Sequence, residues 1–398
     1  MHVAKLLHKM LDNACLSIDK RFRRILFSAT ETLTRCKALS IFGLGRNLNR
    51  TAKVKNNIKC IDRLFGNVNL HSQKELFYQH MTTVLLKGNQ RPLIIVDWSG
   101  LTRCGKYHFL RASVPTKGRA LTLYEQAYPL SNYADPKTHR EFLTTLQTLL
   151  PPNCRPIVMT DAGFRNPWFR LVLSFKWDFI GRARNLTQYQ FSVENGWKSL
   201  KSLYERATYK PTYVGAIHLA KENPLLCHAY LIKQQKMYRV KKNLVGKKIQ
   251  CSMSLKHACR ENEPWLMVSS LSPAEYSAVE IMQCYKKRMQ IEESFRDLKN
   301  TRNGFSLRQC RSYTVKRLNI ALLIAALAAF VLWILGAAAK QKKLHYSFQA
   351  NTEKRRNVLS NFTIGWQVLQ RRIPFTKKEL FLALQAVVLS THQEAASC

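Results

Sequence analysis

Two aspartates occupy positions where they could bind metal ions. Asp97 follows the apolar run 93–96, and Asp161 follows the apolar segment 156–160. A carboxylate is poorly tolerated in an apolar strand unless it is paired or bound to a metal. Functional sites of α/β sheets form at the carboxyl ends of strands. The two residues are therefore candidate ligands for divalent metal ions; the alternative is that they cap strand ends or form ordinary salt bridges.

A third carboxylate lies in a segment without Pro or Gly that predicts one long helix, residues 275–299. At about 100° per residue, Arg288 and Glu292 lie within about 60° of Tyr285, and Lys299 falls on the same stripe. Such a stripe offers one oxygen ligand for a metal, with two cations and a hydroxyl for phosphate groups.

The neighbouring acid Glu293 lies about 100° around the helix from Glu292 and would face elsewhere. Helix geometry therefore selects Glu292. The alternative for the whole segment is a solvated helix with internal ion pairs.

The elements that must position these residues follow strand and helix patterns. Strands are predicted at 93–96, 107–114, 120–128, 156–160 and 178–184, and helices at 136–150 and 166–176. Three adjacent strands, a helix, and then strand-helix-strand is the order of a ribonuclease H-like core. The predicted fold class is therefore α/β, with a mixed sheet flanked by helices.

The chain divides into five predicted regions. Residues 1–90 form a helical N-terminal region, and 91–184 form the first part of the core, with Asp97 and Asp161. Residues 185–271 form a β-rich insertion, 272–339 form the second part of the core, with the Glu292 helix and an apolar helix, and 340–398 form a helical C-terminal region.

Positive charge exceeds what folding requires. The 398 residues include 64 Lys and Arg against 24 Asp and Glu, a formal charge of +40. The hydrophobic content of 46% argues against a disordered polycation. Such an excess repels itself unless a polyanion neutralises it, so nucleic acid is the first candidate partner and a membrane surface the second.

Two segments concentrate this charge. Residues 46–63 hold six basic residues and one acid after a short apolar turn with glycine, which resembles a helix-turn-helix or similar DNA reader. The alternative is a solvated helix face. Between Glu222 and Glu261 there are nine Lys and Arg and no acid. The candidate DNA contacts in the first segment are Arg46, Arg50, Lys53, Lys55, Lys59 and Arg63.

One segment fits two environments. Residues 320–339 are 20 uncharged residues, which is long enough to span a bilayer. Eight of them are alanine, which suits close helix packing inside a protein. Taken alone, the segment could be a transmembrane helix or the buried helix of a large domain.

The motifs together resemble a known family. The pattern Tyr-x2-Arg-x3-Glu-x6-Lys runs from Tyr285 to Lys299, after Asp97 in Val-Asp-Trp-Ser and Asp161 in Thr-Asp-Ala-Gly-Phe. These residues resemble the DDE transposases of bacterial cut-and-paste insertion sequences. The resemblance covers essentially the whole length, including the 64-residue gap between the aspartates and the insertion before the glutamate.

The resemblance implies a chemistry for the three acids. Asp97, Asp161 and Glu292 would hold two Mg²⁺ or Mn²⁺ ions that catalyse in-line phosphoryl transfer. Enzymes of this type nick the transposon end, form and reopen a DNA hairpin, and join the end to target DNA.

It also implies roles for other residues. Tyr285, Arg288 and Lys299 would grip phosphates near the cut. Trp265 would stack on a base flipped out during hairpin formation, with Met289 assisting from the other side. The residues around Trp265 by themselves predict only a half-buried strand residue.

Partners follow from the same resemblance. They are double-stranded DNA, as terminal inverted repeats bound by region 1–90 and as target DNA, and a second copy of the chain in the synaptic complex. Region 340–398 would serve DNA contact or dimerisation. The apolar segment 320–339 would cover the sheet and not enter a membrane, and the location would be cytoplasmic, at the nucleoid.

Two alternatives to a transposase are a transposase-derived DNA-binding protein that lacks catalysis, such as a repressor, and a basic membrane-associated protein.

Overall fold

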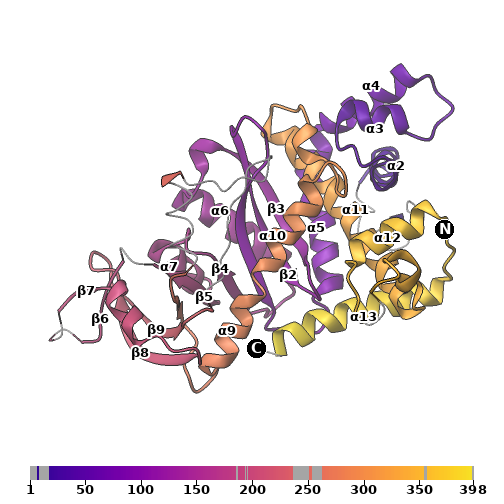
Figure 1. Cartoon of the computed structure of the whole chain (residues 1–398). Helices are drawn as coiled ribbons and strands as arrows, with labels where there is room; N and C mark the ends of the chain where they lie inside the picture. The colour runs from indigo at the N-terminus through magenta and orange to yellow at the C-terminus, as the bar shows by residue number, and fades with distance from the viewer. Residues whose placement is uncertain are drawn as a thin grey trace. The chain divides into compact units, whose positions relative to one another are not determined.

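A computed structural model of the chain describes residues 7–8, 18–184, 187–192, 194, 196–235, 251–252, 262–353 and 356–396. It divides into two compact units (Figure 1). Unit 1 consists of the described residues of Met1–Pro156 and Arg288–Ala396, and unit 2 of those of Ile157–Lys287. Much of the acid-free basic stretch before Glu261 lies outside the described residues.

Unit 1 contains an antiparallel meander whose strands are ordered β3-β2-β1. The strands are β1 (Leu93–Gly100), β2 (Tyr107–Pro115) and β3 (Ala120–Pro129). All three were predicted, and β1 continues four residues beyond the predicted end. Asp97 pairs with Arg111 of β2, and Arg111 pairs in turn with Glu125 of β3.

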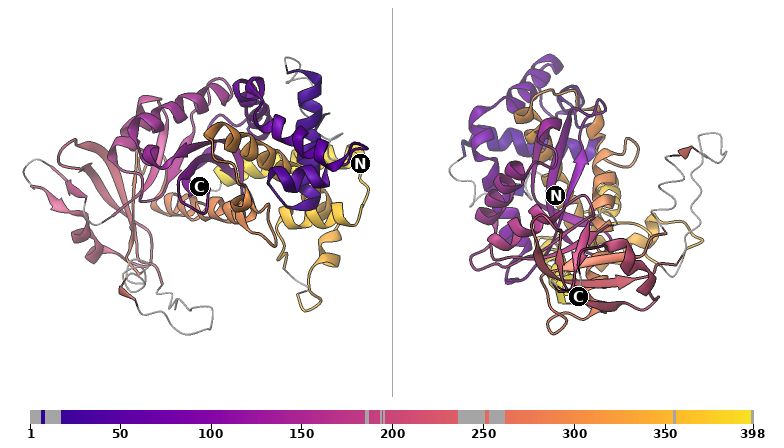
Figure 2. Two further views of the ribbon diagram at one scale, coloured as in Figure 1. Left: turned by 90° about the horizontal axis from the view of Figure 1, so that it is seen from above. Right: turned by 90° about the vertical axis from the view of Figure 1, so that its left-hand side faces the viewer.

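Helices cover both faces of this meander (Figures 1 and 2). On one face, the ring of Tyr124 lies 5.6 Å from Tyr78 of α5 (Val68–Leu85) and 5.0 Å from Phe142 of α6 (Pro136–Leu149). On the other face, Phe295 of α10 (Met289–Lys299) packs edge-on against Phe109 at 5.3 Å. Alternating residues of the strands therefore bury toward different helices, as a two-sided sheet requires.

The apolar segment forms the core of α11 (Val315–Gln341). It is the one helix among the described residues that is long and apolar enough to cross a membrane, and 94% of its most apolar window is buried inside the protein. It packs against β3, and Asn319 accepts a hydrogen bond from the backbone of Ala127 at 2.7 Å. This burial favours the buried-helix alternative.

The N- and C-terminal regions are helical, as the sequence predicts, and several of their helices pack against α11. They contain α2 (Lys20–Cys36), α3 (Ile41–Asn47), α4 (Val54–Phe65), α12 (Asn361–Gln370) and α13 (Lys377–Ala396), with a short 3₁₀ turn at Leu344–Phe348. Two further 3₁₀ turns of unit 1 lie outside these regions, at Leu130–Asn132 and Leu307–Gln309.

Helices α11 and α12 approach closely at two glycines. A Cβ atom on Gly365 would lie 1.9 Å from the carbonyl oxygen of Leu332. We therefore expect Gly365→Ala to lower the free energy of unfolding by about 3 kcal/mol, because backbone on both helices must move apart. Chemical denaturation measures this change. Gly66→Ala is the matched control, because its Cβ would lie 3.4 Å from the flexible Arg317 side chain and no closer than 3.7 Å to any backbone atom given for it. Equal losses in both variants would contradict the packing argument.

Unit 2 contains a seven-stranded mixed sheet with the order β4-β5-β10-β9-β8-β6-β7. Strands β4 and β5 are parallel and are joined by α7, while the other described pairs are antiparallel. The elements are β4 (Ile157–Thr160), α7 (Asn166–Ser174), β5 (Asp178–Ala183), β6 (Gln188–Gln190), β7 (Lys198–Ser199), a 3₁₀ helix (Leu200–Arg206), β8 (Thr212–Leu219), β9 (Leu225–Ile232), β10 (Trp265–Ser269) and α9 (Ala278–Lys286). The predicted α/β class and β-rich insertion are confirmed.

The prediction of one continuous helix over 275–299 is wrong. Helix α9 begins after a capping box at Ser277 and ends at Lys286, and α10 begins at Met289. Lys and Arg are good helix formers, so propensity does not mark the interruption. Arg288 instead occupies the N-cap of α10, where its side chain contacts two carboxylates of unit 1.

Candidate active site

Asp97 lies in the second half of β1, where the burial of the strand decreases. Its side chain is 13% exposed and accepts a charge-assisted hydrogen bond from Nη1 of Arg288 at 3.4 Å. Asp97 therefore lies within the strand and not at its carboxyl end, where the sequence predicts it, because β1 continues to Gly100; the carboxylate stands where the apolar part of the strand ends.

Arg288 connects Asp97 to a second carboxylate. Its Nη2 donates to Oε1 of Glu292 at 2.6 Å, one helical turn along α10. Glu292 remains 39% exposed, whereas the Arg288 side chain is 13% exposed. A single guanidinium therefore bridges two acids that are distant in sequence.

The neighbouring Glu293 points to other partners. It forms an ion pair with Arg296 and lies 3.7 Å from Nη1 of Arg119. Within α10 the residue beside Asp97 and Arg288 is thus Glu292, in agreement with the helix-face argument.

Lys299, at the last turn of α10, lies near the same strand. Its Nζ donates to Oγ of Ser99 at 2.6 Å. Burial, and to a smaller extent repulsion by Arg308 and Arg111, lower the pKa of Lys299 to about 8, and Asp97 partly offsets these effects. Part of the lysine population is therefore neutral slightly above physiological pH.

Met289 begins α10 and is exposed. Its sulfur accepts a contact from Nη2 of Arg288 at 3.3 Å. The structure therefore places this residue beside Arg288 on an accessible surface, where it could touch a nucleic acid.

Asp161 belongs to unit 2 and directly follows β4. Its Oδ1 accepts a hydrogen bond from the backbone of Gly163 at 2.8 Å, within a turn that leads to α7. The side chain is partly exposed. Asp161 is therefore a strand-end carboxylate, as predicted.

Trp265 and Tyr285 lie together in unit 2, with ring centroids 5.3 Å apart and nearly perpendicular planes. Trp265 is half-buried at the start of β10, and Tyr285 is buried in α9. The guanidinium of Arg182 lies 5.7 Å from the Trp265 ring. Sequence reasoning missed Arg182, although an arginine within the apolar strand β5 is a signal of the same kind as Asp97.

Burial lowers the pKa of Arg182, and repulsion by Arg184 adds to this effect. Arginine remains protonated in proteins. Arg182 therefore places a partly desolvated positive charge on the face of the Trp265 ring.

The predicted DNA contacts of the N-terminal region are all exposed on or near α3 and α4, which pack together. The guanidinium of Arg46 lies 5.8 Å from the exposed ring of Phe42, and Arg50 contacts the sulfur of Cys60 at 3.1 Å. The other exposed members are Lys53, Lys55, Lys59 and Arg63.

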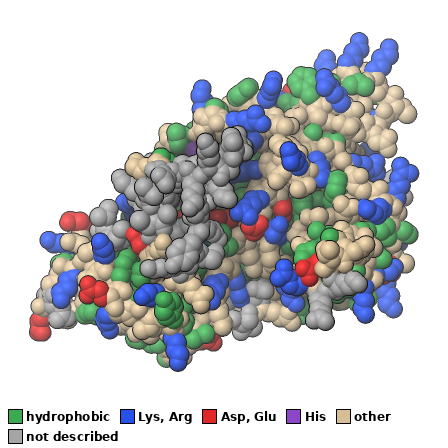
Figure 3. Space-filling view, in the orientation of Figure 1, with side chains coloured by type: hydrophobic (Ala, Val, Ile, Leu, Met, Phe, Trp, Pro, Cys, Tyr) green, Lys and Arg blue, Asp and Glu red, His purple; other side chains and the backbone are tan. Residues whose placement is uncertain are grey.

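Two basic grooves lie on unit 1. The first, about 720 Å³, is lined by α3, the loop after β1 and residues 308–313, and includes Arg46. The second, about 650 Å³, includes Lys299 and shares Arg103 and Arg308 with the first. No acidic side chain lines either groove among the described residues. Lys and Arg side chains are also spread over the face seen in Figure 3.

The donor set of unit 1 fits a hard divalent cation, because carboxylate oxygens are the ligands that Mg²⁺ prefers. Asp97 and Glu292 supply such oxygens on opposite sides of one guanidinium. Within the described ranges no three His, Cys, Asp or Glu side chains gather as a metal cluster. Asp161, the third predicted ligand, belongs to unit 2.

A family comparison agrees with this chemistry. Residues 88–331, more than half of the chain, match the transposase DDE domain. The chain belongs to the DDE transposase family. No curated protein matches it at a significant level.

Membership establishes the coarse properties of this transposase. Its α/β fold is that of the ribonuclease H-like transposases, its substrate is DNA, and its activity is that of a transposition and recombination enzyme. Divalent metal ions generally serve the family. The match includes all three predicted carboxylates and the segment from Trp265 to Lys299, whereas the basic N-terminal helices precede it.

Proposed function

We propose that this transposase moves a bacterial insertion sequence by a cut-and-paste route. It would nick the transposon end, form a hairpin by attack of the freed 3′-hydroxyl on the opposite strand, reopen the hairpin and join the end to target DNA. The Tyr-x2-Arg-x3-Glu-x6-Lys motif supports membership of the subgroup named after those four residues. Within that subgroup we place it near the insertion sequence that flanks the composite tetracycline-resistance transposon.

The observation that carries this proposal is the Asp97–Arg288–Glu292 bridge. Its two acids come from a strand and a helix, and Arg288 stands 191 residues from Asp97 in the chain. Two carboxylates held together by a planar cation, where the apolar part of a strand ends and beside an acid-free groove, suit a phosphodiester substrate.

Asp97, Asp161 and Glu292 would hold two Mg²⁺ or Mn²⁺ ions. When bound, such ions activate the attacking oxygen and stabilise the leaving oxygen of an in-line phosphoryl transfer. Arg288 would supply donors to a phosphate oxygen, since its fork geometry matches phosphate. Lys299 would add a second cation on the groove side, and the Tyr285 hydroxyl a third phosphate contact.

Trp265 would stack on a base displaced from the duplex when the hairpin forms, with Met289 on the other side. A half-buried indole with Arg182 on its face is a firm platform for a base, and stacking of this kind contributes about 1–3 kcal/mol. The exposed thioether of Met289 could fill the gap that the base leaves.

DNA ends would bind to the N-terminal helices and the basic grooves. The exposed cations from Arg46 to Arg63 suit phosphate contacts that fix the register of the duplex. Two ends would be joined in a synaptic dimer, to which the C-terminal helices could contribute. The location would be the cytoplasm, at the nucleoid, and the buried α11 supports a core helix over a membrane anchor.

The test is cleavage of linear DNA that carries candidate transposon ends, with Mg²⁺ or Mn²⁺. Wild-type protein should nick and then form hairpins, and Asp97→Ala, Asp161→Ala and Glu292→Ala should each abolish nicking while retaining DNA binding. Binding to end-containing DNA without cleavage in either metal would replace the proposal by the repressor alternative.

The pKa of Lys299 predicts a pH effect on DNA binding. Because this pKa is lowered to about 8, the lysine is charged below that pH and loses its charge as the pH rises through it. A lost charged contact to phosphate weakens binding about tenfold. Lys299→Arg keeps the charge, so the ratio of variant to wild-type affinity should rise by about that factor between pH 7 and 9. Fluorescence anisotropy measures the ratio, and a constant ratio would contradict the assigned contact.

A further inference from the structure

A line of charged residues crosses the meander of unit 1 in one register. Asp97 of β1 is opposite Arg111 of β2, which is opposite Glu125 of β3. Directly paired residues of antiparallel strands project from the same face of a sheet. All three side chains therefore lie on the face that α10 covers.

Arg111 and Glu125 form a buried ion pair. They are 3% and 1% exposed, and Nε and Nη2 of Arg111 lie 2.8 and 2.6 Å from Oε2 of Glu125. The guanidinium also lies 5.1 Å from the ring of Phe295. Burial raises the pKa of Glu125, and Arg111 opposes that rise.

Such a pair is weak evidence for a role in stability. Removing two charges from water costs several kcal/mol per ion, and apolar replacements of similar volume are often neutral or stabilising. The burial of this ion pair is therefore better explained by what the pair positions than by a gain in stability.

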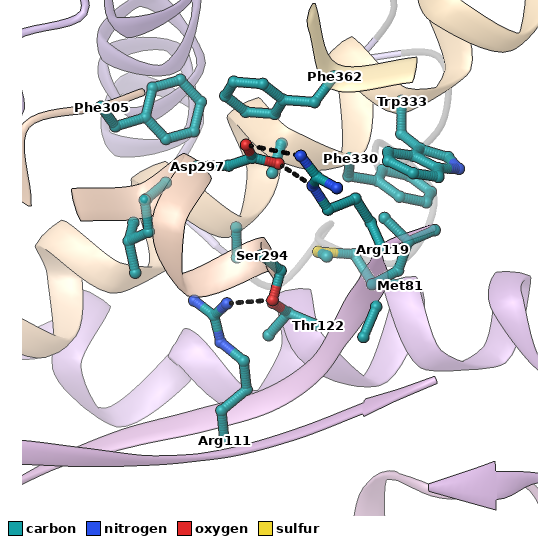
Figure 4. A pocket seen from close by; sticks show the side chains of 16 residues that line it. Met81, Arg111, Arg119, Thr122, Ser294, Asp297, Phe305, Phe330, Trp333 and Phe362 are labelled. Atoms are coloured by element: carbon teal, nitrogen blue, oxygen red, sulfur yellow. Dashed lines mark hydrogen bonds and ion pairs between the residues drawn. The ribbon is translucent and has the colours of Figure 1, made fainter. Parts of the chain in front are cut away.

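The third guanidinium nitrogen of Arg111, Nη1, contacts α10. This nitrogen donates to Oγ of Ser294 on α10 at 3.3 Å (Figure 4). That hydroxyl donates in turn to the carbonyl oxygen of Ile291 at 2.7 Å. Arg111 thus links the register partner of Asp97 to the helix that carries Glu292.

Two residues of the β2–β3 turn also form hydrogen bonds with α10, in addition to the contacts of Arg288 and Lys299 with β1. Gln290 accepts from the backbone of Thr116 at 2.9 Å, and Asp297 accepts from Nε of Arg119 at 2.7 Å. With Ser294 they form a stripe at helical spacing. Of these three contacts, the one from Arg111 starts in register with Asp97.

Apolar packing beneath this part of α10 is incomplete. A cavity of about 40 Å³ lies among Arg111, Arg119, Ser294, Asp297 and the rings of α11 (Figure 4). A rotation of α10 by about 20° would move a side-chain tip on its surface by about 2 Å. Polar links must therefore set the rotation of the helix where packing does not.

We propose that Arg111, held by Glu125, is a positioning residue that sets the rotation of α10 through Ser294 and so brings Glu292 beside Asp97. The proposal rests on the proposed function for its kinetic consequence, but the structural role is independent of it. Arg111 itself touches no reacting atom.

The test uses the full-length protein and two kinds of variant. Ser294→Ala removes the link with little change in volume, and Ser294→Thr keeps the hydroxyl. The double variant Arg111→Met with Glu125→Leu removes the buried charges together. Arg296→Ala, which breaks the exposed ion pair on the outer side of α10, is the matched control.

Ser294→Ala should leave the melting temperature within a few degrees of wild type, and hydrogen exchange of the α10 amides should be about tenfold faster. The catalytic rate of DNA nicking should fall about a hundredfold with unchanged KM, because small misplacements of catalytic groups have effects of that size. The double variant, if it folds, should show the same faster exchange and lower nicking rate as Ser294→Ala. Ser294→Thr should recover the wild-type rate, and Arg296→Ala should match wild type in both measurements.

If Ser294→Ala shows the same hydrogen exchange and the same nicking rate as the wild-type protein, the positioning role is overturned. Equal slowing in Ser294→Thr and Ser294→Ala would also overturn it, because the hydroxyl would then be irrelevant. Failure of the wild-type protein to cut DNA in Mg²⁺ or Mn²⁺ would overturn the proposed function instead, and the exchange rates would still decide the role of Arg111.

Discussion

Glu292→Ala is expected to lower the rate of strand nicking by about a thousandfold, whereas Glu293→Ala should leave it within about twofold. A thousandfold loss corresponds to about 4 kcal/mol of transition-state stabilisation, the scale of one lost metal ligand. Glu292 shares Arg288 with Asp97, while Glu293 pairs with Arg296 and Arg119. Both variants remove the same side-chain atoms, and the two residues are adjacent in one helix.

Single-turnover nicking of end-labelled DNA measures this contrast. Glu292→Gln should be as inactive as the alanine variant, because the amide retains volume and loses the charge that a cation needs. Thermal unfolding of each variant checks that the fold persists. If Glu293→Ala abolishes nicking and Glu292→Ala does not, the assignment of helix faces is wrong.

The strands could be predicted because local pattern and tertiary environment agree. The apolar run before Asp97 marks a buried strand, and the sheet buries it. Strand β1 extends to Gly100 because its backbone continues to pair with β2 as far as His108. Polar residues there carry no hydrophobic signal, so backbone pairing alone determines where the strand ends.

Helix continuity could not be predicted in the same way. Lys287 and Arg288 favour a helix, yet the helical ladder is interrupted between α9 and α10. The contact of Arg288 with Asp97 depends on a residue 191 positions away in the chain. Tertiary contacts of this kind override local propensity.

The same difference between local and tertiary signals applies to the residues of the candidate site. Strand-end position indicates Asp97 and Asp161, and helical spacing indicates Glu292, because each signal is local. The environment of Lys299 depends on burial against Phe109 and Phe295. Spacing identifies that residue, but it does not show that the pKa is low.

The sequence marks Arg111 only as a charge within an apolar strand, as it does Arg182, and gives no indication of its partners. Its partners, Glu125 and Ser294, stand 14 and 183 residues away, and only strand register and helix docking bring the three together. A positioning residue can therefore be recognised from the structure and not from the sequence, whereas a metal ligand belongs to a local sequence motif.

DNA affinity is expected to fall by about 10³ to 10⁵ between 50 and 200 mM salt, the range for a protein with roughly 6 to 10 phosphate contacts. The reason is release of the counterions that phosphates hold. Arg103 and Arg308 line both basic grooves and are exposed, so Arg103→Ala and Arg308→Ala should each reduce the logarithmic salt slope by about 1.

Anisotropy titrations with one end-containing duplex at several salt concentrations measure these slopes. Arg35→Ala is the matched control, because Arg35 is an exposed arginine that pairs with Glu31 on α2 and lines neither groove. Its slope should equal that of wild type. A slope that is unchanged in both groove variants would show that the duplex does not follow the grooves, and the cations of α3 and α4 would then have to carry the contacts. A reduced slope in the groove variants alone would instead place the phosphates along the path that ends at Lys299, beside the carboxylates of the site.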